Sequence, residues 1–364
     1  MLEQDIEALN GEKPEDNGEA RREPQVWGDV ARLVAEARED IDALVARAKE
    51  AAAPDNLTVV LTGDGAALNA AIGSCGQLAI GEAEGMAFAA VDAERLADAP
   101  LTYVPQAGAA LLVALSAVPS DRLVKAVNAV KAEAGRFFCL ALACTPDDPL
   151  AEALTDDDDA FMLTLPVEGD AADRKDAARS ADLDGFGALQ LATLLALDAA
   201  TERQRESRVS DVRELGEQVT QRGAAVGDLE DLAFERVVFL ADGLAGGGAA
   251  REAARQARAR GVDAAFGDLK GAALDPSRTH DALALVFVPS EPTDDREEAL
   301  ADLARLSENA AENGCTPVAV QQDEAPRWEG PAFTFDGCAC LPAGYLALPY
   351  LMVAQQVGVF AAGK

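Results

Sequence analysis

Hydrophobic positions near the start of the chain recur every three or four residues. From Trp27 to Ala48 the apolar side chains follow the spacing of one helix face, with acidic residues between them. This pattern predicts a long amphipathic helix that ends before Pro54. Residues 56–62 then form a short β-branched run that is apolar on both faces, which is typical of a buried parallel strand.

Strand-like and helix-like runs alternate over the next hundred residues. Apolar runs predict further strands, and the stretches between them predict helices, most clearly at Asp121–Ala134. The later predicted strands are at 87–91, 110–116, 137–144 and 161–165. Strands that alternate with helices indicate a parallel sheet with helices on both faces.

The second half of the chain repeats this pattern. The predicted strand Arg236–Leu240 runs into Ala241-Asp242-Gly243, as the strand at 59–62 runs into Gly63-Asp64-Gly65. Two further predicted strands, at 282–289 and 316–321, match those at 110–115 and 137–144. The sequence therefore predicts an α/β protein of two αβα sandwich domains with mainly parallel sheets, related as an internal repeat.

A helical pattern from Leu183 to about residue 221 separates the two repeats. The predicted division is an acidic leader at 1–23, an N-terminal helix with the first α/β domain at 24–182, connecting helices at 183–222, and the second domain with a C-terminal helix at 223–364. The apolar stretch Tyr345–Phe360 contains Pro349 and two glutamines. We interpret it as a core helix between the domains and not as a membrane span.

The net charge of the chain excludes some classes of binding partner. The 364 residues include 64 acidic and 31 basic side chains, a formal net charge of −33. Such a polyanion is repelled by phosphate backbones and anionic membrane surfaces, so we expect no nucleic-acid partner and no membrane. Hydrophobic residues still make up 49% of the chain, so the acids must decorate folded domains.

The cysteines and the first residues of the chain indicate in which cellular compartment the protein is expected. Six cysteines lie in apolar stretches, and the first 24 residues lack the apolar core of a secretory signal. We therefore expect a cytoplasmic protein with reduced thiols. Cys338 and Cys340 have the spacing of half a metal site. Because His280 is the only histidine and no second cysteine pair exists, we expect no metal, and we expect no cofactor.

Several short motifs occur in a distinctive order. They are the opening Pro24–Trp27, the strand–turn Leu61–Gly65, Asp173-Arg174, the strand Phe234–Leu240 and, most distinctively, Ala343–Tyr350. With these motifs the chain, from about Glu23 to its last residue, resembles the double-SIS (sugar isomerase) proteins, in particular the tagatose-6-phosphate ketose/aldose isomerase-like branch. The resemblance implies two SIS-type sandwich domains with phosphosugar sites at the strand ends. It also implies a carboxylate base and a ring-opening histidine, with hydroxyls and helix N-terminal amides that hold the phosphate.

The resemblance assigns ligand binding to seven positions: Gly63, Gly65, Ser116, Ser120, Arg174, Ser180 and Gly243. The family's base carboxylate aligns with Ala259, and its histidine aligns with Leu274. Glu252 lies two helical turns before Ala259, about 10 Å away, and cannot reach the same point. The sequence thus predicts no catalytic residue except one weak candidate, Asp268.

Three functions remain open on this sequence. The joint loss of base, histidine and hydroxyls favours a phosphosugar-binding or regulatory protein that is catalytically impaired. An active isomerase or deaminase, of the tagatose-6-phosphate or amino-sugar phosphate type, is an alternative, as is a scaffold subunit that pairs with an active paralogue. The expected partners are a sugar phosphate and a second copy of the chain in a homodimer. The glycine run 246–248 favours flexible helix entry, and the acids of 294–298 favour a helix start, since acids are stabilising in a first turn.

Overall fold

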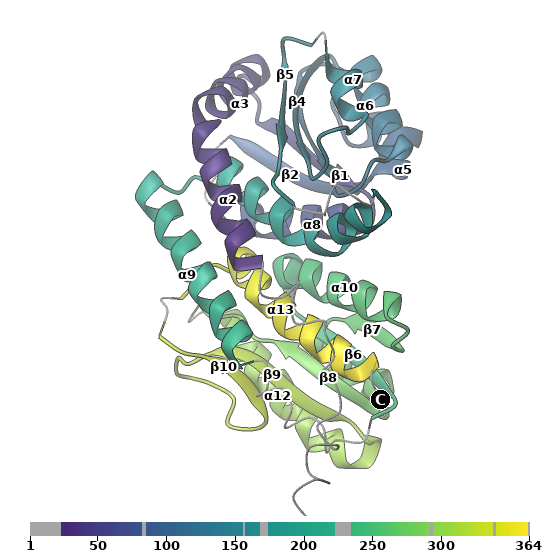
Figure 1. Cartoon of the computed structure of the whole chain (residues 1–364), viewed down its shortest axis with the longest axis vertical. Coiled ribbons are helices and arrows are strands. Elements are labelled where there is room, and N and C mark those ends of the chain that lie inside the picture. The colour runs from purple at the N-terminus through teal and green to yellow at the C-terminus, as the bar shows by residue number, and fades with distance from the viewer. Residues whose placement is uncertain are drawn as a thin grey trace, which may run out of the picture.

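The computed structural model describes residues 23–81, 85–155, 157–167, 174–222, 234–291, 294–337 and 340–362. Two α/β domains are stacked along the long axis of the molecule, and helices from both ends of the chain bridge them (Figure 1). The acidic leader predicted at 1–23 lies outside the described residues except for Glu23.

The first domain contains a five-stranded parallel sheet. Its strands are β1 (Leu57–Gly63), β2 (Met86–Asp92), β3 (Ala109–Ser116), β4 (Arg136–Ala143) and β5 (Ala160–Thr164), in the order β2-β1-β3-β4-β5. One face packs on α3 (Arg38–Ala52), α4 (Ala66–Ile80) and α8 (Arg174–Leu197). The other face packs on α5 (Ala93–Asp98), α6 (Asp121–Glu133) and α7 (Leu150–Leu154).

The second domain has the same topology. Its strands are β6 (Arg236–Ala241), β7 (Ala264–Gly267), β8 (Ala282–Phe287), β9 (Thr316–Gln322) and β10 (Ala332–Phe335), all parallel, and β7-β6-β8-β9-β10 reproduces the first order strand for strand. Its helices are α10 (Gly243–Ala259), α11 (Leu269–Leu274), α12 (Asp294–Asn313) and α13 (Ala343–Ala362). The predicted pair of mainly parallel αβα layers is confirmed. The sequence pattern had not revealed β7 and β10, because each has only four residues.

The predicted N-terminal helix is divided in two at Ala37, into α2 (Glu23–Glu36) and α3. The connecting helices are α8, which begins at Arg174, before the predicted start at 183, and α9 (Glu202–Arg222). Arg38 bridges these breaks, since its guanidinium donates to the carbonyls of Leu195 and Ala196 at the end of α8. These hydrogen bonds are made by a polar side chain at the helix ends, so the spacing of the apolar residues does not indicate where the helices end.

One hydrophobic core runs through both domains. It includes Trp27 of α2, which is 1% exposed and packs against Gly187 of α8 and Gly216 of α9. Within the described residues, α13 is the one helix long and apolar enough to cross a membrane, but 67% of its most apolar window is buried inside the protein. It packs against α4, α8, α9 and α10, as expected for a core helix between the domains.

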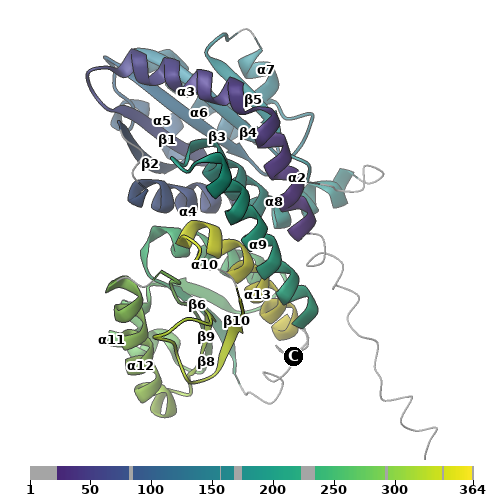
Figure 2. The same ribbon diagram turned by 90° about the vertical axis from the view of Figure 1, so that its left-hand side faces the viewer.

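Helices α4 and α10 form the closest contact between the domains (Figure 2). A Cβ atom on Gly248 would lie 2.6 Å from the carbonyl oxygen of Asn69 and 2.7 Å from the amide nitrogen of Gly73. One turn later, Glu252 accepts a hydrogen bond from the Asn69 amide at 2.9 Å. As α10 advances, its neighbours on α4 recede, so the two helices are antiparallel.

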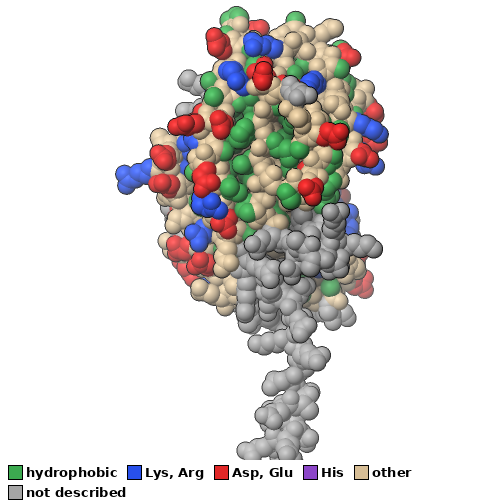
Figure 3. Space-filling view, turned by 45° about the horizontal axis from the view of Figure 1, so that its top comes forward, with side chains coloured by type: hydrophobic (Ala, Val, Ile, Leu, Met, Phe, Trp, Pro, Cys, Tyr) green, Lys and Arg blue, Asp and Glu red, His purple; other side chains and the backbone are tan. Residues whose placement is uncertain are grey.

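The surface carries the acidic excess that the composition requires. Figure 3 shows acidic side chains around the margins of one face, with hydrophobic side chains gathered between them. The acids therefore decorate the folded domains, as the sequence composition predicted.

Candidate functional site

The carboxyl ends of β1, β3 and β4 meet at one edge of the first sheet, where the strand order reverses and α/β proteins place ligands. The turn Gly63-Asp64-Gly65 joins β1 to α4, and Gly65 has a φ of 54°. Its counterpart Gly243, between β6 and α10, has a φ of 71°. Only glycine adopts this backbone region at no steric cost, which accounts for a glycine at the same place in both predicted turns.

Both serines predicted at this edge are bonded to carboxylates. Ser120 caps α6 by accepting from the amide of Leu123 at 3.3 Å, and its hydroxyl donates to Asp64 at 2.5 Å. Ser116, 2% exposed, donates to Asp148 at 2.5 Å, and Asp148 also accepts from the amide of Leu150. Each serine proton that would contact a bound phosphate is therefore directed at an acidic side chain.

Two threonines at the same edge were missed by the sequence reasoning. Thr62 stands at the end of β1, and Thr145 follows β4. The hydroxyl oxygens of both are buried and have no hydrogen-bond partner among the described residues. The signal was present, since Thr62 directly precedes the glycine turn, but its burial without a partner becomes visible only in three dimensions.

Helix α10 of the second domain runs antiparallel to α4 and contacts it at Gly248 and Glu252. Ala259, the position aligned with the family's base, is the last residue of α10 and is exposed. The intervening carboxylate, Glu252, is fully buried and accepts hydrogen bonds from Asn69, Arg255 and Gln256. It holds the two domains together and is closed to a substrate.

A cavity of about 320 Å³ occupies the matching edge of the second domain. By the same antiparallel packing, the end of α4 contributes Gln77 and Ile80 to its wall. The remaining lining comes from the starts of α10, α11, α12 and α13 and from the loop after β8. It comprises Asp242, Gly243, Ala245, Lys270, Pro289, Ser290, Glu291, Asp295, Glu298, Asp302 and Ala343.

This second cavity is acidic. Its five carboxylates face one cation, Lys270. Burial raises the pKa of Asp242, although this carboxyl group accepts hydrogen bonds from the backbone amides of Leu269 and Lys270. The Ser290 hydroxyl is not available to a ligand, because it donates to the carbonyl of Leu341 at 2.6 Å. The charge of this cavity opposes an anion and favours an uncharged or cationic group.

The remaining candidate residues belong to the second domain or to α8. Asp268 caps α11 by accepting from the amide of Gly271 at 2.6 Å, and its side chain is 61% exposed. Leu274, at the histidine position, is 66% exposed. His280 lies on the surface beside Asp281. Arg174 and Ser180 fall in the first turns of α8, where the side chains lie outside the described residues.

The cysteines form no cluster in the described part of the chain. Cys75, Cys139, Cys144 and Cys315 are buried and form no disulfide, and Cys340 is partly exposed beside Glu324. Cys338 lies outside the described residues. Among the described residues, no group of three or more His, Cys, Asp or Glu side chains has a geometry that would hold a metal ion.

Comparison with solved structures identifies the architecture. The tagatose-6-phosphate ketose/aldose isomerase of Escherichia coli superposes with a TM-score of 0.77 and 21% identity, over 94% of this chain and 92% of that chain. The chain has the double-SIS fold.

Two more distant structures share the double-SIS fold along nearly their whole length. The C-terminal domain of glucosamine-fructose-6-phosphate aminotransferase from Francisella tularensis has a TM-score of 0.65 and 15% identity, over 95% of both chains. Glucosamine-6-phosphate deaminase from Thermotoga maritima has a TM-score of 0.57 and 15% identity, over 92% of this chain and 94% of that chain. No family model and no curated protein sequence matches the chain. At these identities the double-SIS likeness establishes the fold, and the function must be argued from the site.

Proposed function

We propose that this chain is an SIS-type protein that binds a carbohydrate derivative in a regulatory role and does not isomerise it. The observation that carries the proposal is the state of the first-domain edge. Its two serine hydroxyls are engaged by Asp64 and Asp148, and the position aligned with the family's base is Ala259, the last residue of α10.

Isomerisation requires a base within about 3 Å of the carbon-bound proton. Glu252 is held in the contact between α4 and α10, and Asp268 caps α11 in the second domain. Neither carboxylate is free at the end of α10. Since loss of a general base typically lowers a rate by 10²–10⁴-fold, we expect no turnover of tagatose, fructose or glucosamine 6-phosphate and no release of ammonia.

The acidic residues at both strand-end sites indicate which charge a bound ligand is expected to carry. The solved neighbours are named for phosphorylated sugars, and a sugar phosphate is the ligand that the sequence resemblance implies. Here a phosphate dianion would meet Asp64 and Asp148 in the first domain and five carboxylates in the second. Repulsion at both places favours an uncharged or amine-bearing sugar over a phosphate monoester.

Calorimetric titration of the full chain with glucosamine and with glucosamine 6-phosphate tests the ligand class. We expect the unphosphorylated amine to bind more tightly. Asp64→Asn removes one repelling charge and is expected to tighten phosphate binding about five- to tenfold, from the roughly 1 kcal/mol between unit charges 4 Å apart in water. Asp55→Asn, at an exposed site before β1, is the matched control and should change nothing.

The two parts of the proposal fail separately. Tighter binding of the phosphate by the unmodified chain would overturn the ligand class and leave the catalytic argument in place. Turnover above about 1 s⁻¹ on any of the three sugar phosphates, lost in Asp268→Asn, would instead restore the active isomerase and assign its base.

A further inference from the structure

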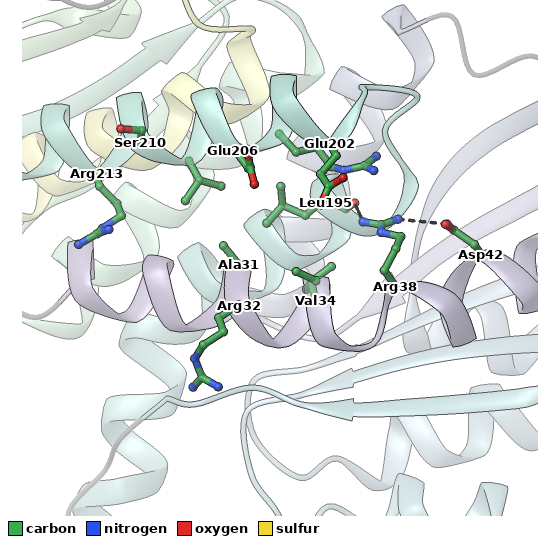
Figure 4. Close-up of a pocket in the computed structure, with 13 residues that line it drawn as sticks. Ala31, Arg32, Val34, Arg38, Asp42, Leu195, Glu202, Glu206, Ser210 and Arg213 are labelled. Carbon is green, nitrogen blue, oxygen red and sulfur yellow. Dashed lines mark hydrogen bonds and ion pairs between the residues drawn. The ribbon is translucent and has the colours of Figure 1, made fainter.

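A groove of about 610 Å³ lies away from both strand-end sites, between α2–α3 on one side and α9 on the other (Figure 4). Its size falls in the range of ligand and peptide sites. The floor is apolar and is made by Ala31, Val34, Ala35, Leu195 and Val209.

The first half of α9 forms one wall of the groove and is otherwise poorly covered. The buried residues of α9 are Val212, Leu215, Gly216 and Val219, all in its second half. Val209, one turn earlier, is half-buried and packs at the margin of the core. The groove therefore leaves apolar surface of α2 and α9 open, at Ala31, Ala35 and Val209, above the buried Val34 and Leu195.

Arginines close both ends of the groove. Arg38 donates to carbonyls at the end of α8, and Arg205 donates to the carbonyl of Ala200 at 2.5 Å. These two guanidinium groups are close enough that burial and the charge of Arg38 lower the pKa of Arg205. At the other end Arg213 reaches across from α9 and donates to the carbonyl of Pro24 at 3.0 Å.

The lining has more cations than anions, unlike the molecule as a whole. Its arginines are Arg32, Arg38, Arg205 and Arg213, and its acids are Asp42, Glu202 and Glu206. Arg38 pairs with Asp42, and Arg32 pairs with Asp29 and Glu36, which leaves Arg205 and Arg213 opposite Glu202 and Glu206. In a chain with a net charge of −33, a groove without an acidic excess accepts an occupant that is apolar on one face and acidic on the other.

The start of this chain has that character. Leu2, Ile6 and Leu9 are spaced i, i+4 and i+7, as on one face of a helix, and three acids, Glu3, Asp5 and Glu7, are interleaved with them. Residues 10–22 connect this segment to α2. At about 3.3 Å per extended residue they span up to about 43 Å, whereas Ala31 lies about 12 Å along α2 from Glu23.

We propose that residues 2–9 bind the groove between α2–α3 and α9, with Leu2, Ile6 and Leu9 on its apolar floor and the acids toward its arginines. The segment then covers the exposed half of α9 and the α2–α3 break. Binding is intramolecular, so the short tether supplies a high effective concentration that a separate peptide of this length lacks.

Photo-crosslinking in the full chain tests this contact. p-Benzoylphenylalanine replaces Ile6 in one protein and Glu7, on the other face, in a matched control. After irradiation, the Ile6 probe is expected to attach within residues 31–38 or 202–213 in the monomer band, and the Glu7 probe is not. Leu2→Asp/Leu9→Asp, which leaves the groove itself intact, should abolish attachment from position 6.

Three outcomes would overturn the proposal: attachment from position 6 outside the groove, attachment that survives Leu2→Asp/Leu9→Asp, or attachment found only in a crosslinked dimer. The last outcome would show that a second copy fills the groove. Loss of attachment on Val209→Asp, checked for folding by circular dichroism, would support the assignment to this floor.

Discussion

Replacement of Gly248 by alanine tests the contact that holds the two domains together. The new Cβ atom would stand 2.6 Å from the carbonyl oxygen of Asn69, whereas ordinary contact begins at 3.4 Å. The obstacle is backbone of α4, so α4 and α10 must separate by about 0.8 Å. Overpacking of this kind costs about 1–3 kcal/mol, because neighbouring side chains lose contacts over the whole interface.

Gly247 provides a control within the same helix. No atom lies within 4 Å of a Cβ atom built there. Both substitutions gain the same helix propensity, about 1 kcal/mol, so the difference between them isolates the contact with α4. We expect Gly247→Ala to be about 1–3 kcal/mol more stable than Gly248→Ala.

Urea denaturation followed by circular dichroism measures this difference. At an m-value of about 3 kcal/mol/M, a difference of 2 kcal/mol moves the midpoint by about 0.7 M. Equal midpoints for the two variants, or a higher midpoint for Gly248→Ala, would refute the close antiparallel packing of α4 and α10.

Three further predictions concern stability and assembly. Glu252→Ala leaves Asn69 and Arg255 without their buried carboxylate, so the free energy of unfolding should fall by about 3–5 kcal/mol. In the same urea assay, the exposed control Glu217→Ala should change it by less than about 0.5 kcal/mol. Burial raises the pKa of Asp242, so the folded state binds this proton more tightly than the unfolded chain and stability falls as pH rises from about 4 through the raised value. Asp242→Asn should remove this fall in stability. A difference in unfolding free energy between the variant and the unmodified protein that stays constant between pH 4 and 7 would disprove the raised pKa. The proposed homodimer brings together two chains of −33 each, so light scattering should show more dimer as salt rises, and a monomer at every salt concentration would count against it.

Most of the fold could be predicted because long buried strands carry a plain apolar signal. The strand at 57–62 and its counterpart at 236–240 both run into Asp-Gly turns, and that repeated pattern located the two equivalent edges. β7 was not predicted because four residues of alanine, phenylalanine and glycine carry no such signal. Gly248 was interpreted as flexible helix entry, whereas the structure uses it for the approach of a second helix, and nothing local to the glycine run indicates that partner.

Polar side chains were the hardest part to predict. Ser116 and Ser120 were rightly placed at the strand ends, but their acidic partners come from other loops, 32 and 56 residues away. Arg296 stands in the run 294–298, which the sequence predicts as an acidic helix start and which opens α12. It is 1% exposed and donates to the carbonyls of Ser290, Glu324 and Pro326. Pairings across such distances depend on the finished fold and leave no local periodicity.

The most direct test of the central claim is proton exchange at carbon. The full chain is incubated in D₂O with fructose 6-phosphate, tagatose 6-phosphate or glucosamine 6-phosphate, and deuterium at C1 or C2 is followed by NMR. This readout detects proton abstraction even when no product accumulates. With Ala259 and Leu274 in place of the base and histidine that the resemblance implies, we predict exchange no faster than without protein. Exchange above that background, lost in Asp268→Asn, would contradict the account.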